Sequence, residues 1–256
     1  MASTEGQAPS RKVAGPFVVL RSIATYVAIV LYVALLGPPC LLIALVFGRP
    51  GVLYRVGDAG IRMGLFLSGI TPSVTGREHI QRARPAVYAV NHASNVEPPV
   101  VFSALHELFP RLRILYKAEL RKLPVLVRAF DLVGFVPLER GNRDQSLPAI
   151  DRAVEGLKDG NSFLIFPEGT RSRTGELLPF KKGGFIMAIK AQAPIIPIAI
   201  HGAREAMRKG SPLIFPVRVR VHIGEPIDTA GLTLDDRDRL TTLVRSRIAA
   251  LLAGMK

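Results

Sequence analysis

Tryptophan is absent from this chain, and only five tyrosines are present. A surface that stacks nucleic-acid bases needs such side chains, so it is poorly supplied here. The single cysteine, Cys40, lies in an apolar run, which excludes an internal disulfide and a cysteine cluster for a metal. Because no other stretch has metal-ligand spacing, we predict no metal site and no resident cofactor.

Acidic residues are also scarce. The 256 residues include 34 Lys and Arg against 20 Asp and Glu, giving a net charge of +14. The mean hydropathy is nevertheless positive, at +0.28. A chain that is both basic and apolar fits an anionic membrane surface better than it fits a nucleic acid, which we do not expect as a partner. The length suits one large domain with a short appendage.

Charged residues are missing between Ser22 and Phe47. This run is long enough to span a hydrocarbon core, which needs about 20 residues, and too long for a cleaved signal peptide. A buried core helix is the alternative interpretation. Gly37-Pro38-Pro39 interrupts the run, so we predict that the helix breaks or kinks near Leu36.

Basic residues flank the run on both sides, which suits a hairpin that enters the membrane and returns to the same face. We therefore predict a disordered tail at 1–15, a membrane-associated helical segment at 16–70 and a re-entrant hairpin within 16–48. The protein is expected at the cell membrane, monotopic or single-pass, with its catalytic domain on the cytoplasmic side.

From residue 71 to residue 256, apolar runs typical of buried strands alternate with helical patterns. This predicts an α/β domain with a mixed, largely parallel sheet flanked by helices, preceded by an N-terminal membrane-embedded helical hairpin. The expected strands are 86–90, 113–116, 134–138, 162–166, 194–200 and 217–223. The expected helices are 98–108, 147–158, 183–192 and 234–253, the last behind a cap formed by Thr233 and Asp236.

A histidine and a carboxylate follow the strand predicted at 86–90. His92 and Glu97 are five residues apart, which on an ideal helix places them about 140° from each other. They can pair only if the chain between them forms an irregular turn, which Ser94, Asn95 and the prolines after Glu97 allow. Such a pair is a general base with the carboxylate that orients it. A histidine that is hydrogen-bonded for structural reasons is the alternative.

The strand predicted at 162–166 leads into Phe166-Pro167-Glu168-Gly169-Thr170-Arg171-Ser172. Together with Asn91-His92…Glu97, this stretch resembles the glycerolipid acyltransferases, whose members carry an N-H-x-x-x-x-D block and an F-P-E-G-T-R-S block. Two further blocks of that family are similar to residues 134–140 and 194–198. The four blocks cover roughly residues 70 to 225. Glu97 departs from the pattern, because it stands where the family has aspartate.

The resemblance implies an acyltransferase that esterifies a lysophospholipid, most simply 1-acylglycerol-3-phosphate, with acyl-CoA or acyl-carrier protein as the donor. Glycerol-3-phosphate or another lysolipid as the acceptor is an alternative, and so is a lipid-binding homologue without catalysis. His92 would be the base. No activated nucleophile is apparent, because Cys40 lies in the membrane run and Ser94 is too close to His92, so we expect direct attack by the acceptor hydroxyl.

The acceptor phosphate needs fixed cations. The planar guanidinium of Arg171 suits bidentate binding of phosphate, and Gly169 before it permits a tight turn. We expect Glu168 to orient Arg171 or to meet the glycerol hydroxyls. Ligands gather at the carboxyl edge of a parallel sheet, where several other candidates lie. The remaining predicted substrate-binding residues are Asn91, Lys117, Arg140, Thr170 and Lys181, the last beside Lys182 at the start of a helix.

Overall fold

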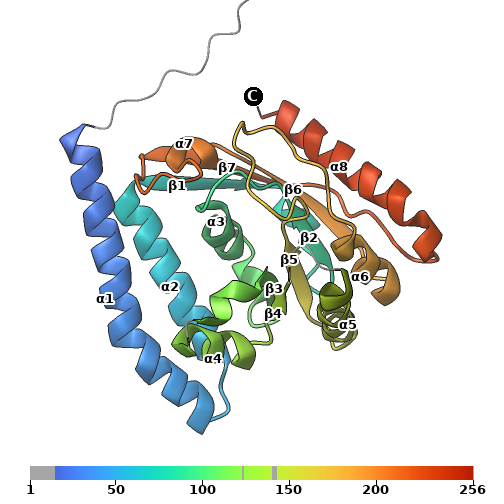
Figure 1. Ribbon diagram of the computed structural model, residues 1–256, viewed down its shortest axis with the longest axis horizontal. Helices are drawn as coiled ribbons and strands as arrows, with labels where there is room; N and C mark the ends of the chain where they lie inside the picture. The colour runs from blue at the N-terminus through green and yellow to red at the C-terminus, as the bar shows by residue number, and fades with distance from the viewer. Residues whose placement is uncertain (1–14, 123, 140–142, 256) are drawn as a thin grey trace, which may run out of the picture.

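The computed structural model describes residues 15–122, 124–139 and 143–255, and these form a seven-stranded mixed sheet (Figure 1). Along the sheet the order is β1-β7-β6-β2-β5-β3-β4. Neighbours pair in parallel except β6 with β7, so β1 and β7 run opposite to the other five. The strands are β1 (Ile70–Thr75), β2 (Val87–Val90), β3 (Leu112–Lys117), β4 (Val136–Leu138), β5 (Ser162–Ile165), β6 (Ile195–His201) and β7 (Val217–Ile223).

Helices cover both faces of the sheet (Figure 1). One face packs against α2 and α3, with α1 outside α2, and the other packs against α5, α6 and α8. The helices are α1 (Pro16–Val46), α2 (Gly51–Ser68), α3 (Glu97–Ala104), α4 (Pro124–Leu132), α5 (Arg143–Lys158), α6 (Gly183–Ala191), α7 (Ala203–Ala206) and α8 (Arg237–Ala253).

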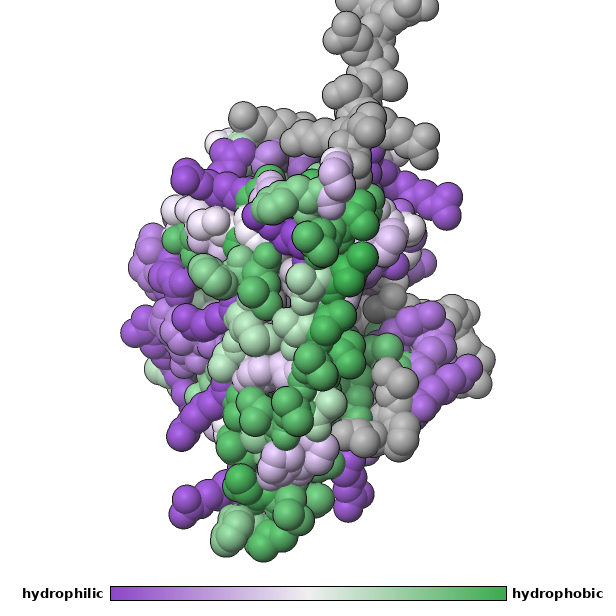
Figure 2. Space-filling model, turned by 90° about the vertical axis from the view of Figure 1, so that its left-hand side faces the viewer, coloured by the Kyte–Doolittle hydropathy of each residue, from purple (hydrophilic) through white to green (hydrophobic). Residues whose placement is uncertain are grey.

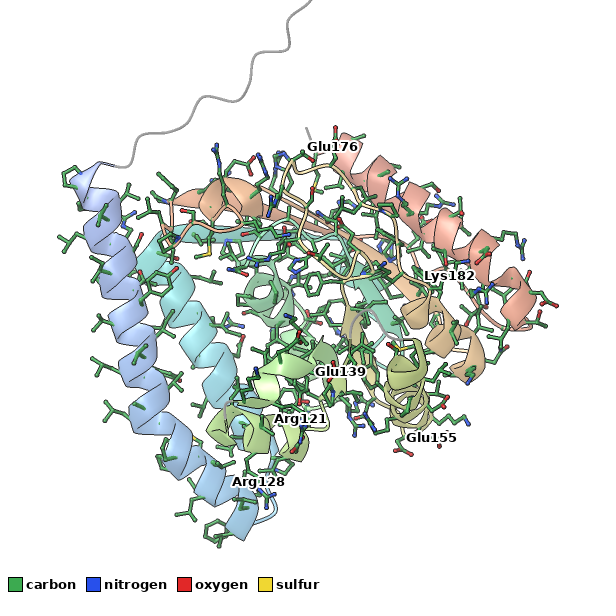
Figure 3. All side chains as sticks on the ribbon, in the orientation of Figure 1. Arg121, Arg128, Glu139, Glu155, Glu176 and Lys182 are labelled. Atoms are coloured by element: carbon green, nitrogen blue, oxygen red, sulfur yellow. The ribbon has the colours of Figure 1, made fainter. Side chains whose placement is uncertain are left out.

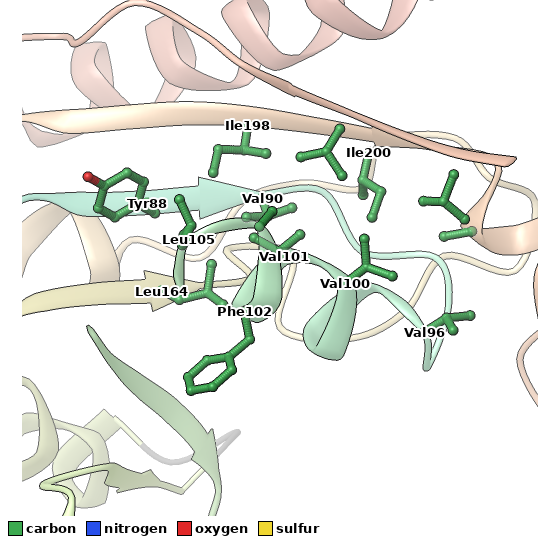
Figure 4. Close-up of a cluster of buried hydrophobic side chains, with 14 of the residues drawn as sticks. Tyr88, Val90, Val96, Val100, Val101, Phe102, Leu105, Leu164, Ile198 and Ile200 are labelled. Atoms are coloured by element: carbon green, nitrogen blue, oxygen red, sulfur yellow. The ribbon is translucent and has the colours of Figure 1, made fainter. Parts of the chain in front are cut away.

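The central strand β2 is buried on both faces, as its continuous apolar sequence predicts. Because side chains alternate along a strand, Tyr88 and Val90 enter one core cluster while Val87 and Ala89 enter the other. Figure 4 shows the first cluster, where Val90 lies beside Val101 of α3. A strand held on both sides in this way gives the residues that follow Val90 a fixed starting point.

The predicted fold class is confirmed, including the six expected strands and a capping box formed by Thr233 and Asp236. Strand β1, helix α4 and the four-residue helix α7 were not predicted. Strand β1 contains Pro72, a residue that strands tolerate mainly at a sheet edge, and β1 is indeed an edge strand. The nine-residue α4 is short enough that its apolar pattern did not stand out.

Of the predicted break or kink near Leu36, the break is wrong. Helix α1 runs without interruption from Pro16 to Val46, with Pro38 and Pro39 inside it. Two adjacent prolines remove only the donors for the two carbonyls four residues earlier, while the apolar sequence continues to favour helix on both sides. The chain instead turns after α1, where Gly48 takes a left-handed φ of 60°. The hairpin is therefore formed by α1 and α2.

Among the described residues, α1 is long enough and apolar enough to cross a membrane. Most of its outward face is apolar (Figure 2). Helix α2 differs, because Tyr54 and Leu65 enter the same core cluster as α3. The predicted boundary at residue 70, between a membrane-associated segment and the α/β domain, therefore stays a prediction. The tail predicted at 1–15 lies outside the described residues except for Gly15.

Candidate active site

Strand β2 ends at Val90, and Asn91 fixes the chain immediately after it. The Asn91 side chain donates to the carbonyl of Ile200 (3.0 Å) and accepts from its N–H (2.8 Å). This pair of bonds attaches the end of β2 to β6. The Asn91 amide thus holds the backbone of a neighbouring strand directly before His92, and its predicted contact with substrate stays a prediction.

His92 and Glu97 lie within hydrogen-bonding distance. His92 Nδ1 is 2.7 Å from Glu97 Oε2, and both Glu97 oxygens also accept from the N–H of Ala93, at 2.8 and 2.9 Å. The turn between them is irregular, as expected. Ser94 stabilises it by accepting from the N–H of Val96 (3.2 Å) and donating to the carbonyl of Met207 (2.7 Å). The Ser94 hydroxyl is thus used within the fold.

The Glu97 side chain is 1% exposed. Burial raises its pKa, and the N–H groups of Ser94 and Ala93 and the charge of Arg171 lower it, leaving the pKa raised to about 8. A carboxylate held this way is stabilised by a positive charge at His92. The pair is therefore suited to a reaction in which an imidazolium forms.

The loop after β5 is attached to the His92 loop through Glu168. Its Oε1 accepts from the N–H of His92 (2.6 Å) and its Oε2 from the N–H of Leu178 (3.0 Å), while Ser172 N–H donates to the carbonyl of His92 (2.7 Å). Burial raises the pKa of Glu168. Both Glu168 oxygens thus hold backbone groups, and its predicted roles, orienting Arg171 or meeting the glycerol hydroxyls, stay predictions.

Arg171 lies at the same site. Gly169 adopts a left-handed φ of 68°, which allows the turn predicted there. Arg171 Nη1 donates to Asn95 Oδ1 at 2.6 Å, and its charge is close enough to lower the pKa of Glu97. The loops after β2 and β5 thus bring a base, a carboxylate and a guanidinium together at the carboxyl edge of adjacent strands.

Lys209, which follows α7, is a cation that the sequence did not single out. Its ammonium donates to Thr170 Oγ1 (3.2 Å) and to the carbonyl of Arg171 (2.9 Å). Lys209 lies outside every recognised block and outside any periodic pattern, so no signal in the sequence could have revealed it. Asn95 was treated as a turn residue, although its contact with Arg171 belongs to the site.

The other predicted cations are less closely joined to the pair. Lys117 ends β3 at the same sheet edge and forms an ion pair with Glu119 (2.8 Å). Lys181 is exposed, and its side chain passes close to Gly169. Lys182 forms an ion pair with Asp238 of α8 (2.8 Å), and in Figure 3 it lies toward that helix. Arg140 lies outside the described residues.

This fold and site define an acyltransferase. The family described as Acyltransferase matches residues 71–201, which is more than half of the chain, and the chain belongs to this family. The matched segment starts in β1 and ends with β6, so it includes both loops of the site.

Relatives carry a more specific name. The chain is 32% identical over 198 residues to the 1-acyl-sn-glycerol-3-phosphate acyltransferase of Limnanthes douglasii, covering 77% of this chain and 68% of the relative. It is 29% identical over 224 residues to the alpha form of Mus musculus, covering 87% and 76%. The fold is also that of the 1-acyl-sn-glycerophosphate (LPA) acyltransferase PlsC from Thermotoga maritima, with a TM-score of 0.79, 24% identity and coverage of 94% and 97%.

Proposed function

We propose that this protein is a membrane-associated lysophospholipid acyltransferase that acts on 1-acylglycerol-3-phosphate. It moves an acyl chain from acyl-CoA or acyl-carrier protein to the free hydroxyl of the acceptor, which gives phosphatidic acid. The names of the relatives support this acceptor. The observation that carries the proposal is the pair of partly buried His92 and buried Glu97, with Nδ1 and Oε2 2.7 Å apart, beside Arg171.

In the proposed reaction, Nε2 of His92 takes the proton of the acceptor hydroxyl as its oxygen attacks the thioester carbonyl. Glu97 stabilises the imidazolium that results. The tetrahedral intermediate then expels the thiolate, which takes the proton from His92, so a C–O bond replaces a C–S bond. General-base catalysis of this kind contributes about 10²–10⁴ in rate. No acyl-enzyme is needed, in keeping with the use of the Ser94 hydroxyl in the fold.

Arg171 and Lys209 are the proposed phosphate ligands. Arg171 presents a planar fork, and Lys209, which follows α7, adds a second positive charge that is hydrogen-bonded to the Arg171 loop. The rigid backbone contacts through Glu168 keep these charges in place relative to His92. Asn91, Gly169 and Thr170 shape the same loops. Lys117 at the end of β3 and Lys181 beside Gly169 are proposed to meet the donor or the lipid surface.

Helix α1 supports membrane association, and we propose that the catalytic domain lies on the cytoplasmic side of the cell membrane. There, soluble donors such as acyl-CoA reach the site from water while the lipid acceptor reaches it from the bilayer. The basic charge of the chain favours the anionic surface of that leaflet.

The test is an acyl-transfer assay with the purified protein in detergent or vesicles. Acceptors are 1-acylglycerol-3-phosphate, glycerol-3-phosphate and lysolipids with other head groups, each offered with acyl-CoA and with acyl-carrier protein. We expect thioester-dependent formation of phosphatidic acid. A preference for glycerol-3-phosphate would show that the acceptor is glycerol-3-phosphate and not 1-acylglycerol-3-phosphate. Binding of lysolipid without any transfer would indicate a lipid-binding protein without catalysis.

A further inference from the structure

Phe166 directly follows β5, and the proposed reaction gives it no role. Its ring lies against the imidazole of His92, with the two ring centres 4.4 Å apart and the planes inclined at 35°. Aromatic pairs usually have their centres about 4.5–7 Å apart, so this contact is a close one. The imidazole is thus held by Glu97 at one edge and covered by a phenyl ring on one face.

The fold holds Phe166 in place. Its carbonyl accepts from the N–H of Gly169 (3.0 Å), which closes the turn after β5. Its ring is partly buried and packs against the core cluster that contains Val90 and Leu164. Because a close-packed core yields little, the ring cannot move away from the imidazole without opening that cluster. Phe166 is therefore a fixed wall beside His92.

The bond to Glu97 fixes the imidazole at one atom only. A ring held through Nδ1 can still tilt about that bond. Such a tilt moves Nε2, the atom proposed to take the proton, and a misplacement of about 1 Å at a reacting atom can cost about a hundredfold in rate. The Phe166 ring blocks the tilt toward its own side. The contact therefore sets the direction of Nε2, which the hydrogen bond alone leaves open.

The contact also acts on the charge of His92. The face of a phenyl ring is electron-rich and attracts a cation that lies within about 6 Å of its centre. In the proposed reaction His92 becomes positive while the acceptor hydroxyl attacks, so the attraction grows as the transition state is reached. An interaction that is stronger in the transition state than in the ground state increases the rate.

We propose that Phe166 is a positioning residue that fixes the plane of the His92 imidazole and favours its protonated form, an inference that rests on the proposed function. The described charged groups that act on the pair of His92 and Glu97 lie on two further segments: Glu168 and Arg171 in the loop after β5, and Glu205 of α7. All of them are kept in the variants below, so that the ring is the group that changes.

Phe166→Leu tests the proposal, because leucine keeps an apolar side chain beside His92 and removes the aromatic face. We expect kcat to fall about tenfold or more. The midpoint of the pH profile of kcat/KM should fall by about half to one unit, since losing the contact destabilises the imidazolium about three- to tenfold. The KM for acceptor and donor should stay within about twofold, because the proposed contact is with His92 alone.

Phe166→Tyr is the conservative variant, because it keeps the ring, and its kcat and midpoint should stay close to those of the wild type. Phe130→Leu is the matched control. Phe130 of α4 is also half-buried, and its ring centre lies 4.8 Å from that of Tyr116 and 5.2 Å from that of Phe135. Removing this ring should lower the melting temperature and leave the pH profile of transfer unchanged.

The NMR signal of the His92 ring gives a readout that does not depend on transfer. The protein is labelled with carbon-13 at Cε1 of its five histidines, and the His92 signal is assigned by its loss in His92→Ala. A phenyl ring over the imidazole face shifts this signal upfield. In Phe166→Leu the signal should therefore move downfield, and its titration midpoint should fall by about half to one unit.

An unmoved titration midpoint in Phe166→Leu would overturn the proposal, and so would equal losses of kcat in Phe166→Leu and Phe166→Tyr. A raised KM with normal kcat would also overturn it, because Phe166 would then contact a substrate. Absence of transfer by the wild-type protein would refute the proposed function. The NMR titration would still decide whether the ring controls the protonation of His92.

Discussion

At the scale of single residues, Glu97 is where this chain leaves the family motif. The longer side chain reaches His92 from the first residue of α3, and both of its oxygens also accept from the N–H of Ala93. The added methylene is therefore accommodated by the turn between the two residues. If Glu97 has the role of the usual aspartate, its negative charge must stabilise the imidazolium of His92. Substitution of Glu97 can test this.

Glu97→Gln should lower turnover by about 10²–10⁴, because an amide cannot stabilise the imidazolium and favours the wrong tautomer of His92. Glu97→Asp should be intermediate, since charge is kept and reach is shortened. His92→Ala should be at least as damaging as Glu97→Gln. Turnover is measured for the three variants, with melting curves as the folding control. Near-normal turnover in Glu97→Gln beside an inactive His92→Ala would make Glu97 purely structural.

The raised pKa of Glu97 predicts the pH dependence. Glu97 and His92 share a hydrogen bond, so they titrate as a pair that holds one additional proton up to about pH 8. That proton blocks His92 as a base, so kcat/KM should rise with pH and level off above about 8. Glu97→Gln should move the midpoint down toward about 6.5, the ordinary value of histidine. An unmoved midpoint would show that the pair does not set the profile.

Arg171→Lys keeps the charge and loses the planar fork, so the KM for a phosphate-bearing acceptor should rise by about tenfold or more. The bond to Asn95, 2.6 Å long, also holds the guanidinium in one orientation that a lysine cannot reproduce. Arg173→Lys is the matched control, being an exposed arginine two residues away on the same loop. Equal kinetics in the two variants would remove Arg171 from the phosphate site.

At the scale of elements, the sequence predicted most of what carries the site. The apolar runs before His92 and Glu168 identified β2 and β5, and parallel pairing brings their ends together. What the sequence could not supply was set by contacts between distant residues. The roles of Asn91 and Glu168 depend on backbone groups of Ile200 and Leu178, which no local pattern reveals. The proline pair led to a wrong prediction of a helix break, because α1 continues through Pro38 and Pro39.

The α1–α2 hairpin predicts a topology. Because α2 packs into the core, α1 beside it can remain docked only if both of its ends stay with the catalytic domain. In a Cys40→Ala background, cysteines at Gly15 and Gly51, which have open Cβ positions, should be labelled alike from one side of sealed vesicles. Glu155→Cys on α5 marks the side of the catalytic domain. Opposite labelling of the two ends would mean that α1 crosses the bilayer.

At the scale of the whole molecule, two separate forces should hold the protein on a membrane. The net charge of +14 attracts anionic lipid, and this attraction weakens as salt shortens the screening length from about 8 Å at 0.15 M to about 3 Å at 1 M. The apolar face of α1 contributes burial of hydrocarbon, which salt does not screen. The two contributions can therefore be separated by experiment.

Wild-type protein should sediment more strongly with anionic than with neutral vesicles, and 1 M salt should remove that difference while leaving residual binding. Leu20, Leu31 and Leu35 are 66%, 54% and 70% exposed on α1. Changing all three to serine should reduce the residual binding by more than about tenfold, because each buried leucine contributes roughly 1.5–3 kcal/mol. If the triple variant binds neutral vesicles as the wild type does, α1 is not the membrane contact, and the lipid acceptor must reach His92 by a different face.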